Sequence, residues 1–283
     1  MLRVREIKEL VREHNLGISP RRLGQHFLVD PKALARLAAE LGAGQEDRVL
    51  EIGAGLGALT EELLKSGATL YAVERDARFL KVLTSRFRDS ANLQLVRSDI
   101  LRVDLASYAL GDPKSILVIG NIPYSLTSPI LEFLLHQRRW VRRVLLTIQK
   151  EVADRIVAQP GTKAYSSLSV LVGVAFVPSI VFTIPPGSFY PQPKVTSAVL
   201  RLDPLSEPVV NPEEEEGILR LVRGLFTHRR KTLLNGLLTS GGKIAKEELL
   251  QRLHKNGIDP NRRAETFSLA EFSELFRSTL GVR

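Results

Sequence analysis

The chain is organised around Val118-Ile119-Gly120-Asn121-Ile122-Pro123-Tyr124, in which an apolar run gives way to an amide, a proline and an aromatic ring. The β-branched start of this stretch predicts a buried strand, and ligands bind at the carboxyl ends of strands in open α/β sheets. Pro123 donates no N–H, so we expect the carbonyl of Ile122 to remain free as an acceptor. Oxygens of Asn121 and Ile122 aimed at one point suit an amino group with two hydrogens, and Tyr124 offers a flat face to a planar base. An isolated Asn-x-Pro-Tyr is also compatible with an ordinary turn, and the rest of the chain decides between the two.

A glycine-rich turn lies upstream of this stretch. The predicted strand over residues 48–52 runs into Gly53-Ala54-Gly55-Leu56-Gly57, which a helix over 58–65 follows. Strand, glycine turn and helix form the half-unit of nucleotide-binding sheets, where small residues let a ligand approach the backbone. The spacing is G-x-G-x-G, whereas dinucleotide enzymes carry G-x-G-x-x-G. The turn alone is therefore a moderate signal, and a tight turn without a ligand is the alternative.

Carboxylates follow the next two predicted strands, Glu74 after the first and Asp99 after the second. An acidic residue about 20 positions beyond the first glycine accepts ribose hydroxyls in such folds; a solvated charge before a helix is the alternative for Glu74. Asp99 is suited to an adenine amino group or, alternatively, to capping a turn. Because Gly53, Glu74, Asp99 and Asn121 follow four successive strands, we expect them to share one edge of the sheet.

The middle of the chain continues the α/β pattern. Strands are predicted over 144–148, 180–184 and 195–202, the last two as a hairpin, whereas the apolar segment 168–177 fits a strand or a helix. A proline-rich loop precedes the last strand and carries Phe189. This ring either packs in the core or, held between prolines, forms a stacking platform.

The division into domains follows from the change in pattern near residue 205. Residues 1–205 are predicted to form the main α/β domain, with 1–20 as an N-terminal extension made of a helix and a linker. A linker over 203–212 precedes a helical region. Residues 206–283 are therefore predicted to form a small all-helical domain, which carries the basic cluster 227–231.

Composition narrows the class of protein. The formal net charge of +9 indicates a polyanionic partner, or alternatively a means of staying soluble. There is no cysteine, which excludes disulfides, a thiol nucleophile and thiolate metal sites. We expect no metal, no transmembrane helix and no secretory signal, and we expect a cytoplasmic monomer.

Taken together, the motifs resemble the ribosomal RNA adenine dimethyltransferase family, and most of all its bacterial small-subunit branch. The matching residues are Leu23-Gly24-Gln25-His26-Phe27-Leu28, Glu51-Ile52-Gly53-Ala54-Gly55-Leu56-Gly57, Glu74, Ser98-Asp99-Ile100, Asn121-Ile122-Pro123-Tyr124 and Phe189-Tyr190-Pro191-Gln192-Pro193-Lys194-Val195. The resemblance implies a Rossmann-like class I methyltransferase fold with a seven-stranded, mainly parallel sheet and a helical, RNA-contacting C-terminal domain. It implies S-adenosylmethionine as methyl donor. The implied acceptor is N6 of two adjacent adenosines near the 3′ end of 16S rRNA, within the small ribosomal subunit or its precursor.

Site residues follow from the resemblance by position. The implied donor-binding residues are Gln25, His26, Leu28, Gly53, Gly55, Glu74, Asp99 and Asn121. Glu74 would take the ribose and Asp99 the adenine, while the methionine end lies over the glycine turn. His26 departs from the family, which often has Asn at this position.

The implied catalytic residues are Asn121, Pro123, Tyr124 and Phe189. Tyr124 and Phe189 would stack on a base splayed out of a loop, and the two oxygens beside Pro123 would draw the hydrogens of its amino group out of plane. A sulfonium leaves as a neutral group, so no strong general base is required. Candidate contacts to RNA are Arg142, Arg143, Arg229, Arg230 and Lys231.

Three other functions remain as alternatives. A large-subunit rRNA adenine methyltransferase of the macrolide-resistance type shares nearly the same core. A non-catalytic RNA-binding assembly factor would explain the charge and the helical tail, but not the Asn121-Ile122-Pro123-Tyr124 set. A nicotinamide oxidoreductase is disfavoured by the glycine spacing.

Overall fold

The computed structural model describes residues 2, 4–16, 25–240 and 244–279, and these form two compact units. The first unit comprises the chain up to residue 153 together with 179–204, and the second comprises 154–178 together with the chain from 205 onward. Leu23 and Gly24, the first two residues of the motif over Leu23 to Leu28, lie outside the described residues.

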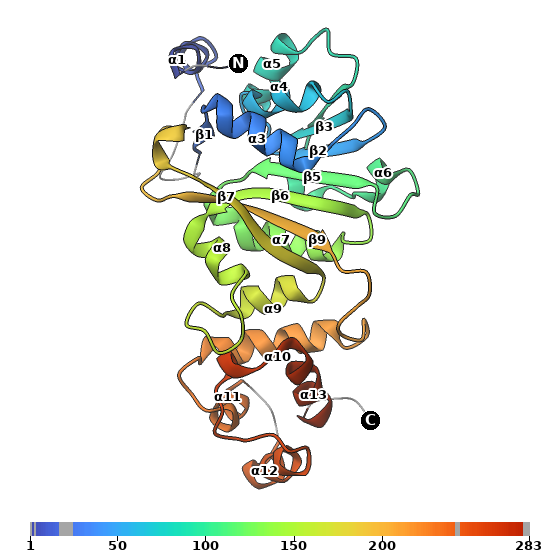
Figure 1. Ribbon diagram of the computed structural model, residues 1–283, viewed down its shortest axis with the longest axis vertical. Coiled ribbons are helices and arrows are strands. Elements are labelled where there is room, and N and C mark those ends of the chain that lie inside the picture. The colour runs from blue at the N-terminus through green and yellow to red at the C-terminus, as the bar shows by residue number, and fades with distance from the viewer. Residues whose placement is uncertain (1, 3, 17–24, 241–243, 280–283) are drawn as a thin grey trace. The chain divides into compact units, whose positions relative to one another are not determined.

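The first unit contains a seven-stranded sheet among the described residues (Figure 1). Its strands, in spatial order, are β4 (Leu93–Arg97), β3 (Thr69–Glu74), β2 (Arg48–Ile52), β5 (Ile116–Asn121), β6 (Val141–Gln149), β9 (Ser197–Pro204) and β7 (Phe176–Ile184). The strands from β4 to β6 are parallel, and β9 pairs with β6 in the antiparallel direction. From β2 the chain first adds β3 and β4 on one side of the sheet, and it then returns to add β5 and β6 on the other side. The order of strands therefore reverses between β2 and β5. The predicted, mainly parallel sheet is confirmed, as is the pairing of the last two long strands.

Helices surround this sheet. They are α1 (Val4–Glu13), α3 (Pro31–Leu41), α4 (Ala58–Leu64), α5 (Ala77–Arg86), α6 (Ala106–Ala109), α7 (Thr127–His136) and α8 (Lys150–Ile156), with short 3-10 turns η1 (Ile100–Arg102), η2 (Tyr124–Leu126) and η3 (Pro186–Ser188). The start of α3 is fixed by Asp30, whose carboxylate accepts from the N–H groups of Lys32 and Ala33. Gly42 ends this helix in the left-handed conformation.

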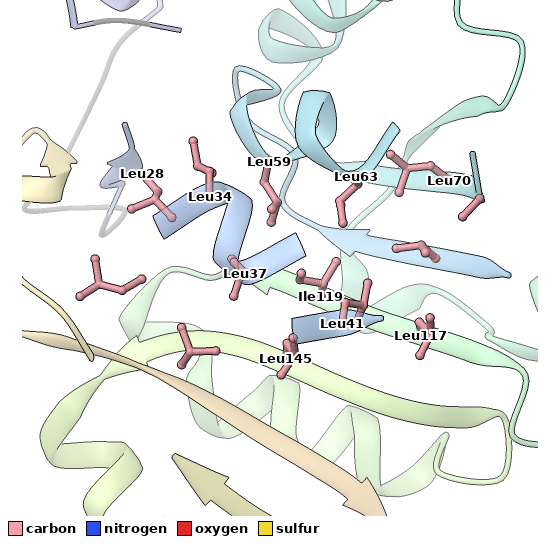
Figure 2. Packing of buried hydrophobic residues seen from close by; sticks show 14 of the residues in the cluster. Leu28, Leu34, Leu37, Leu41, Leu59, Leu63, Leu70, Leu117, Ile119 and Leu145 are labelled. Atoms are coloured by element: carbon pink, nitrogen blue, oxygen red, sulfur yellow. The ribbon is translucent and has the colours of Figure 1, made fainter. Parts of the chain in front are cut away.

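The main core lies between α3, α4 and one face of the sheet. Figure 2 shows Leu34, Leu37 and Leu41 of α3 facing the strands, with side chains of α4 and of β5 and β6 around them. The helical spacing of these three leucines places them on one stripe, and each is at most 1% exposed. Burial of each such side chain stabilises the fold by roughly 1.5–3 kcal/mol. This packing holds the carboxyl ends of β2 and β5 in fixed register.

A small two-stranded sheet joins two distant motifs. β1 (Phe27–Leu28) pairs with β8 (Phe189–Tyr190) in the antiparallel direction, with Leu28 opposite Phe189. Phe189 is 4% exposed and belongs to the core cluster that contains Leu28 and Leu34. Of the two interpretations that the sequence leaves open for this ring, the structure shows core packing. The expected exposed stacking platform is absent at Phe189.

The N-terminal extension is part of the first unit. Leu2 and Ile7 are buried in a cluster with Phe79 and Val82 of α5. The amphipathic pattern of α1 accounts for this, because its apolar stripe has to be buried against a partner. No helix within the described ranges is long and apolar enough to cross a membrane.

The second unit is helical. Its elements are α9 (Ser167–Gly173), α10 (Glu215–Thr227), α11 (Leu233–Thr239), α12 (Lys246–Lys255), η4 (Ala264–Thr266) and α13 (Leu269–Thr279). The ambiguous segment 168–177 is thus mostly helix, and β7 begins only at Phe176. The compact unit differs from the predicted domain because it also takes in 154–178. The reason is that α9 packs on α10, with the rings of Tyr165 and Phe226 6.0 Å apart.

Candidate active site

A cavity of about 350 Å³ opens at the carboxyl ends of β2, β3, β4 and β5 in the first unit. Most of the residues predicted for the site line it, namely Gln25, His26, Leu28, Gly53, Gly55, Glu74, Asp99, Asn121 and Pro123. Tyr124 and Phe189 are not among the lining residues. The four strand-end positions are therefore brought together, as the parallel order of the strands requires.

The glycine turn forms one wall of this cavity. Gly53 and Gly55 have positive φ angles of 73° and 55°, which side-chain-bearing residues rarely adopt. A Cβ added to Gly53 would meet no atom within 4 Å, so the space beside the backbone is open to the cavity. A bound molecule can therefore reach the backbone here.

Glu74 is held by the backbone at the end of β3. Its carboxylate accepts from the N–H of Gly55 at 3.0 Å and from the N–H of Asp76 at 2.8 Å. Burial raises the pKa of Glu74, and the backbone hydrogen bonds partly oppose this rise. A carboxylate has about four acceptor positions, so further lone pairs remain for a ligand such as a diol.

Asp99 caps a turn, which is one of the two roles that the sequence leaves open, and it also lines the cavity. One carboxylate oxygen accepts from the N–H of Leu101 at 3.1 Å and so caps η1. The other lies 3.2 Å from a guanidinium nitrogen of Arg75, whose side chain is largely exposed. The residue caps a turn and lines the cavity at the same time.

Glu51 is a site residue that sequence reasoning missed. Its side chain lines the cavity and is 1% exposed, and Thr60 donates its hydroxyl to it over 2.7 Å. Burial, reinforced by the nearby charge of Glu74, raises the pKa of Glu51 to about 7. A carboxylate within the apolar strand 48–52 is the signal that could have revealed it, because unpaired acids are rarely fully buried.

Asn121 is anchored through its amide nitrogen. Asn121 is the last residue of β5, and it donates its side-chain N–H to the backbone carbonyl of His26 over 2.8 Å. The side-chain oxygen is therefore directed away from His26 and is the half of the amide left for an incoming donor. Pro123, which lines the cavity, follows the carbonyl of Ile122 and contributes no N–H of its own.

Tyr124 is fixed at two points. Its hydroxyl is 2.8 Å from the hydroxyl of Ser197, and its ring stacks on the imidazole of His26 at 5.7 Å between centroids and 27° between planes. Partial burial raises the pKa of this phenol. Phe189, the ring expected to act with Tyr124 on a base, packs in the core, and the ring in contact with Tyr124 is that of His26.

No group of three or more His, Cys, Asp or Glu in the described part of the chain is placed to hold a metal ion. The polar side chains of the lining residues include the carboxylates of Glu51, Glu74 and Asp99 and the amide of Asn121.

The strand order that reverses between β2 and β5, the antiparallel pairing of β9 with β6 and the cavity beside the glycine turn define a class I methyltransferase. The family model described as "Ribosomal RNA adenine dimethylase" matches residues 19–279. The chain belongs to this family, and it is therefore an RNA adenine methyltransferase whose methyl donor is S-adenosylmethionine.

Similar proteins of known name support this membership. "Ribosomal RNA small subunit methyltransferase A" of Geobacter metallireducens is 44% identical over 270 residues, which cover 94% of this chain and 98% of that protein. The protein of the same name from Geobacillus thermodenitrificans is 39% identical over 95% of this chain and 93% of its own length.

Solved structures agree at the level of the fold. A dimethyladenosine transferase from Plasmodium falciparum aligns with a TM-score of 0.74 at 25% identity, covering 89% of this chain and 96% of its own. The 23S rRNA methyltransferase ErmE aligns with a TM-score of 0.66 at 26% identity, covering 89% and 99%.

Proposed function

We propose that this protein dimethylates N6 of two adjacent adenosines near the 3′ end of the small-subunit rRNA, acting as a cytoplasmic monomer on the small subunit or its precursor. The observation that carries the proposal is the Asn121 amide, anchored through its nitrogen on His26 so that its oxygen is left for an amino group. Relatives with near-full coverage carry a small-subunit name, which favours this rRNA over that of the large subunit.

The donor is proposed to lie along the strand ends. Glu74 would accept the ribose hydroxyls with the lone pairs that Gly55 and Asp76 leave, and Asp99 would accept from the adenine amino group. The open backbone at Gly53 would take the methionine end. The remaining donor contacts are proposed for Gln25, His26, Leu28, Gly55 and Asn121, all of which line the cavity.

S-adenosylmethionine supplies an electrophilic methyl group whose sulfur leaves without charge. The chain's own residues have to hold and polarise the adenine nitrogen, which is a poor nucleophile because its lone pair is delocalised into the ring. The side-chain oxygen of Asn121 and the carbonyl of Ile122 would accept its two hydrogens and stabilise the positive charge that develops. Tyr124 would hold the base by stacking, at a site where Pro123 fixes the backbone.

The helical unit is proposed to contact RNA. Of the five basic candidates, Arg142, Arg143 and Arg229 form ion pairs with Asp47, Asp203 and Glu265. Arg230 and Lys231 are exposed, and Lys231 donates to the hydroxyl of Thr239. Phosphate contacts are therefore assigned first to Arg230 and Lys231.

The test is to incubate the protein with radiolabelled S-adenosylmethionine and either isolated small or isolated large ribosomal subunits. Label in the small subunit, mapped by mass spectrometry to dimethylated adenosines near the 3′ end, is expected. Label confined to the large subunit would favour a macrolide-resistance type of activity. Donor binding without transfer to either particle would favour a non-catalytic assembly factor.

A further inference from the structure

Three contacts converge on His26 from segments that are far apart in the sequence. Its backbone carbonyl accepts from the Asn121 amide at 2.8 Å. Its ring nitrogen Nδ1 lies 2.6 Å from the carbonyl of Pro191 and, facing a carbonyl, is the donor. Its ring stacks on Tyr124. One residue thus touches the amide, the aromatic ring and the proline-rich loop.

Two of these contacts are to Asn121 and Tyr124, the residues proposed to hold the acceptor base. The geometry of the two rings, 5.7 Å and 27°, lies within the range of offset stacking. Because the phenol of Tyr124 is also tied to the buried Ser197, the tyrosine is fixed at its tip and on one face. The opposite face of Tyr124 is the one that the His26 ring leaves for a base.

We propose that His26 is a positioning residue for the acceptor, and that its ring backs Tyr124 so that the adenine is held at the correct angle to Asn121. The buried Phe189 cannot supply this second ring, whereas the imidazole is already in contact. The hydrogen bond from Nδ1 to the carbonyl of Pro191 fixes the orientation of the imidazole ring. This inference rests on the proposed function and assigns to His26 a role in acceptor geometry beyond the donor contact that its place in the cavity suggests.

Substitutions at His26 separate the effect of its ring on the acceptor from the effect of its N–H donor. His26→Ala removes the ring, His26→Gln keeps an N–H donor without a ring, and His26→Phe keeps a ring without the N–H. Single-turnover methyl transfer to small subunits at saturating donor is expected to fall about 10-fold or more in the first two and to recover at least 3-fold in His26→Phe. Because His26 is also proposed to contact the donor, the Kd for S-adenosylmethionine is measured by calorimetry for each variant, and transfer is compared at a donor concentration that saturates that variant.

Two outcomes would overturn the inference. One is a single-turnover rate at saturating donor that equals the wild-type rate in His26→Ala and His26→Gln, and the other is a His26→Phe variant as slow as His26→Gln. Thermal unfolding of each variant identifies any variant that fails to fold. If His26→Ala fails to fold, the comparison of His26→Gln with His26→Phe decides the question. The wild-type protein tests the small-subunit assignment, because a wrong assignment would leave the small subunit unmethylated by the wild type. The variants are compared with the wild type on the adenosine that it methylates, so they test the role of His26 separately.

Discussion

The side-chain N–H of Asn121 and the backbone carbonyl of His26 are 2.8 Å apart, although 95 positions separate them in the chain. This bond holds the amide nitrogen of Asn121 on His26, so the side-chain oxygen is the half of the amide that is proposed to meet the acceptor. A side-chain amide has one accepting oxygen and one NH2 group that donates two hydrogens. Only the oxygen can accept a hydrogen from an amino group.

Replacement of Asn121 by alanine is expected to reduce methyl transfer about 100- to 1000-fold, the usual cost of losing one group that stabilises a transition state. Donor affinity is expected to fall much less than methyl transfer, because the glycine turn, Glu74 and Asp99 remain as donor contacts. The measurement is incorporation of radiolabelled methyl groups into small subunits. Gln94→Ala, at an exposed amide on β4, is the matched control. Wild-type turnover in Asn121→Ala would remove Asn121 from the mechanism.

Replacement of Glu74 by glutamine is expected to weaken binding of S-adenosylmethionine about 10- to 100-fold, because hydrogen bonds to a charged group contribute about 1.5–3 kcal/mol. The amide oxygen can still accept from the N–H of Gly55, so the turn is expected to keep its shape. Calorimetric titration with the donor measures the effect. Glu46→Gln, at an exposed position, serves as control, and equal affinities in both variants would exclude the ribose contact.

Glu51 makes stability depend on pH. Its pKa rises from 4.5 to about 7 on folding because of burial, so the folded state binds the proton more tightly than the unfolded state. The resulting stability is fully present below pH 4.5 and is lost as the pH rises to about 7. Glu51→Gln is therefore expected to be more stable than the wild type at pH 8, by up to about 3 kcal/mol.

Urea unfolding at pH 5 and pH 8 checks this expectation. The advantage of Glu51→Gln over the wild type is expected to be larger at pH 8. Thr60 can donate its hydroxyl to the amide oxygen as it does to the carboxylate, so no new unpaired group is created. An advantage that is the same at both pH values would show that Glu51 does not titrate between them.

Gly120 allows two strands to approach closely. A Cβ at this position would lie 2.8 Å from the carbonyl oxygen of Ile52 in β2 and 2.9 Å from its Cβ. Since backbone cannot move aside as a flexible side chain can, Gly120→Ala is expected to destabilise the protein by about 1–3 kcal/mol. Gly187→Ala is the control, because a Cβ there meets no atom within 4 Å. Thermal denaturation compares the two, and equal midpoints would contradict the close approach.

The local patterns predicted the sheet and most of the cavity. Parallel strands bring their carboxyl ends to one edge, so the residues after each strand could be grouped without knowing any distance. Gly53, Glu74, Asp99 and Asn121 do line one cavity. The segment 168–177 was ambiguous because a short apolar run fits a buried helix as well as a strand.

Contacts between side chains that are far apart in the sequence could not be predicted from local patterns. The sequence shows that Phe189 lies between prolines, but only the pairing of β1 with β8 buries it beside Leu28. Likewise, the packing of α9 on α10 moves 154–178 out of the unit that the sequence order suggests.

The sequence by itself determined where most strands lie along the chain, the glycine turn and the set of polar residues at the strand ends, because these depend on local periodicity and on the conformational limits of glycine and proline. Only the tertiary structure decided that His26 faces Tyr124, that Glu51 is buried at the cavity and that Phe189 is in the core. Contacts between residues distant in the chain depend on how the packed elements meet, which no local pattern records.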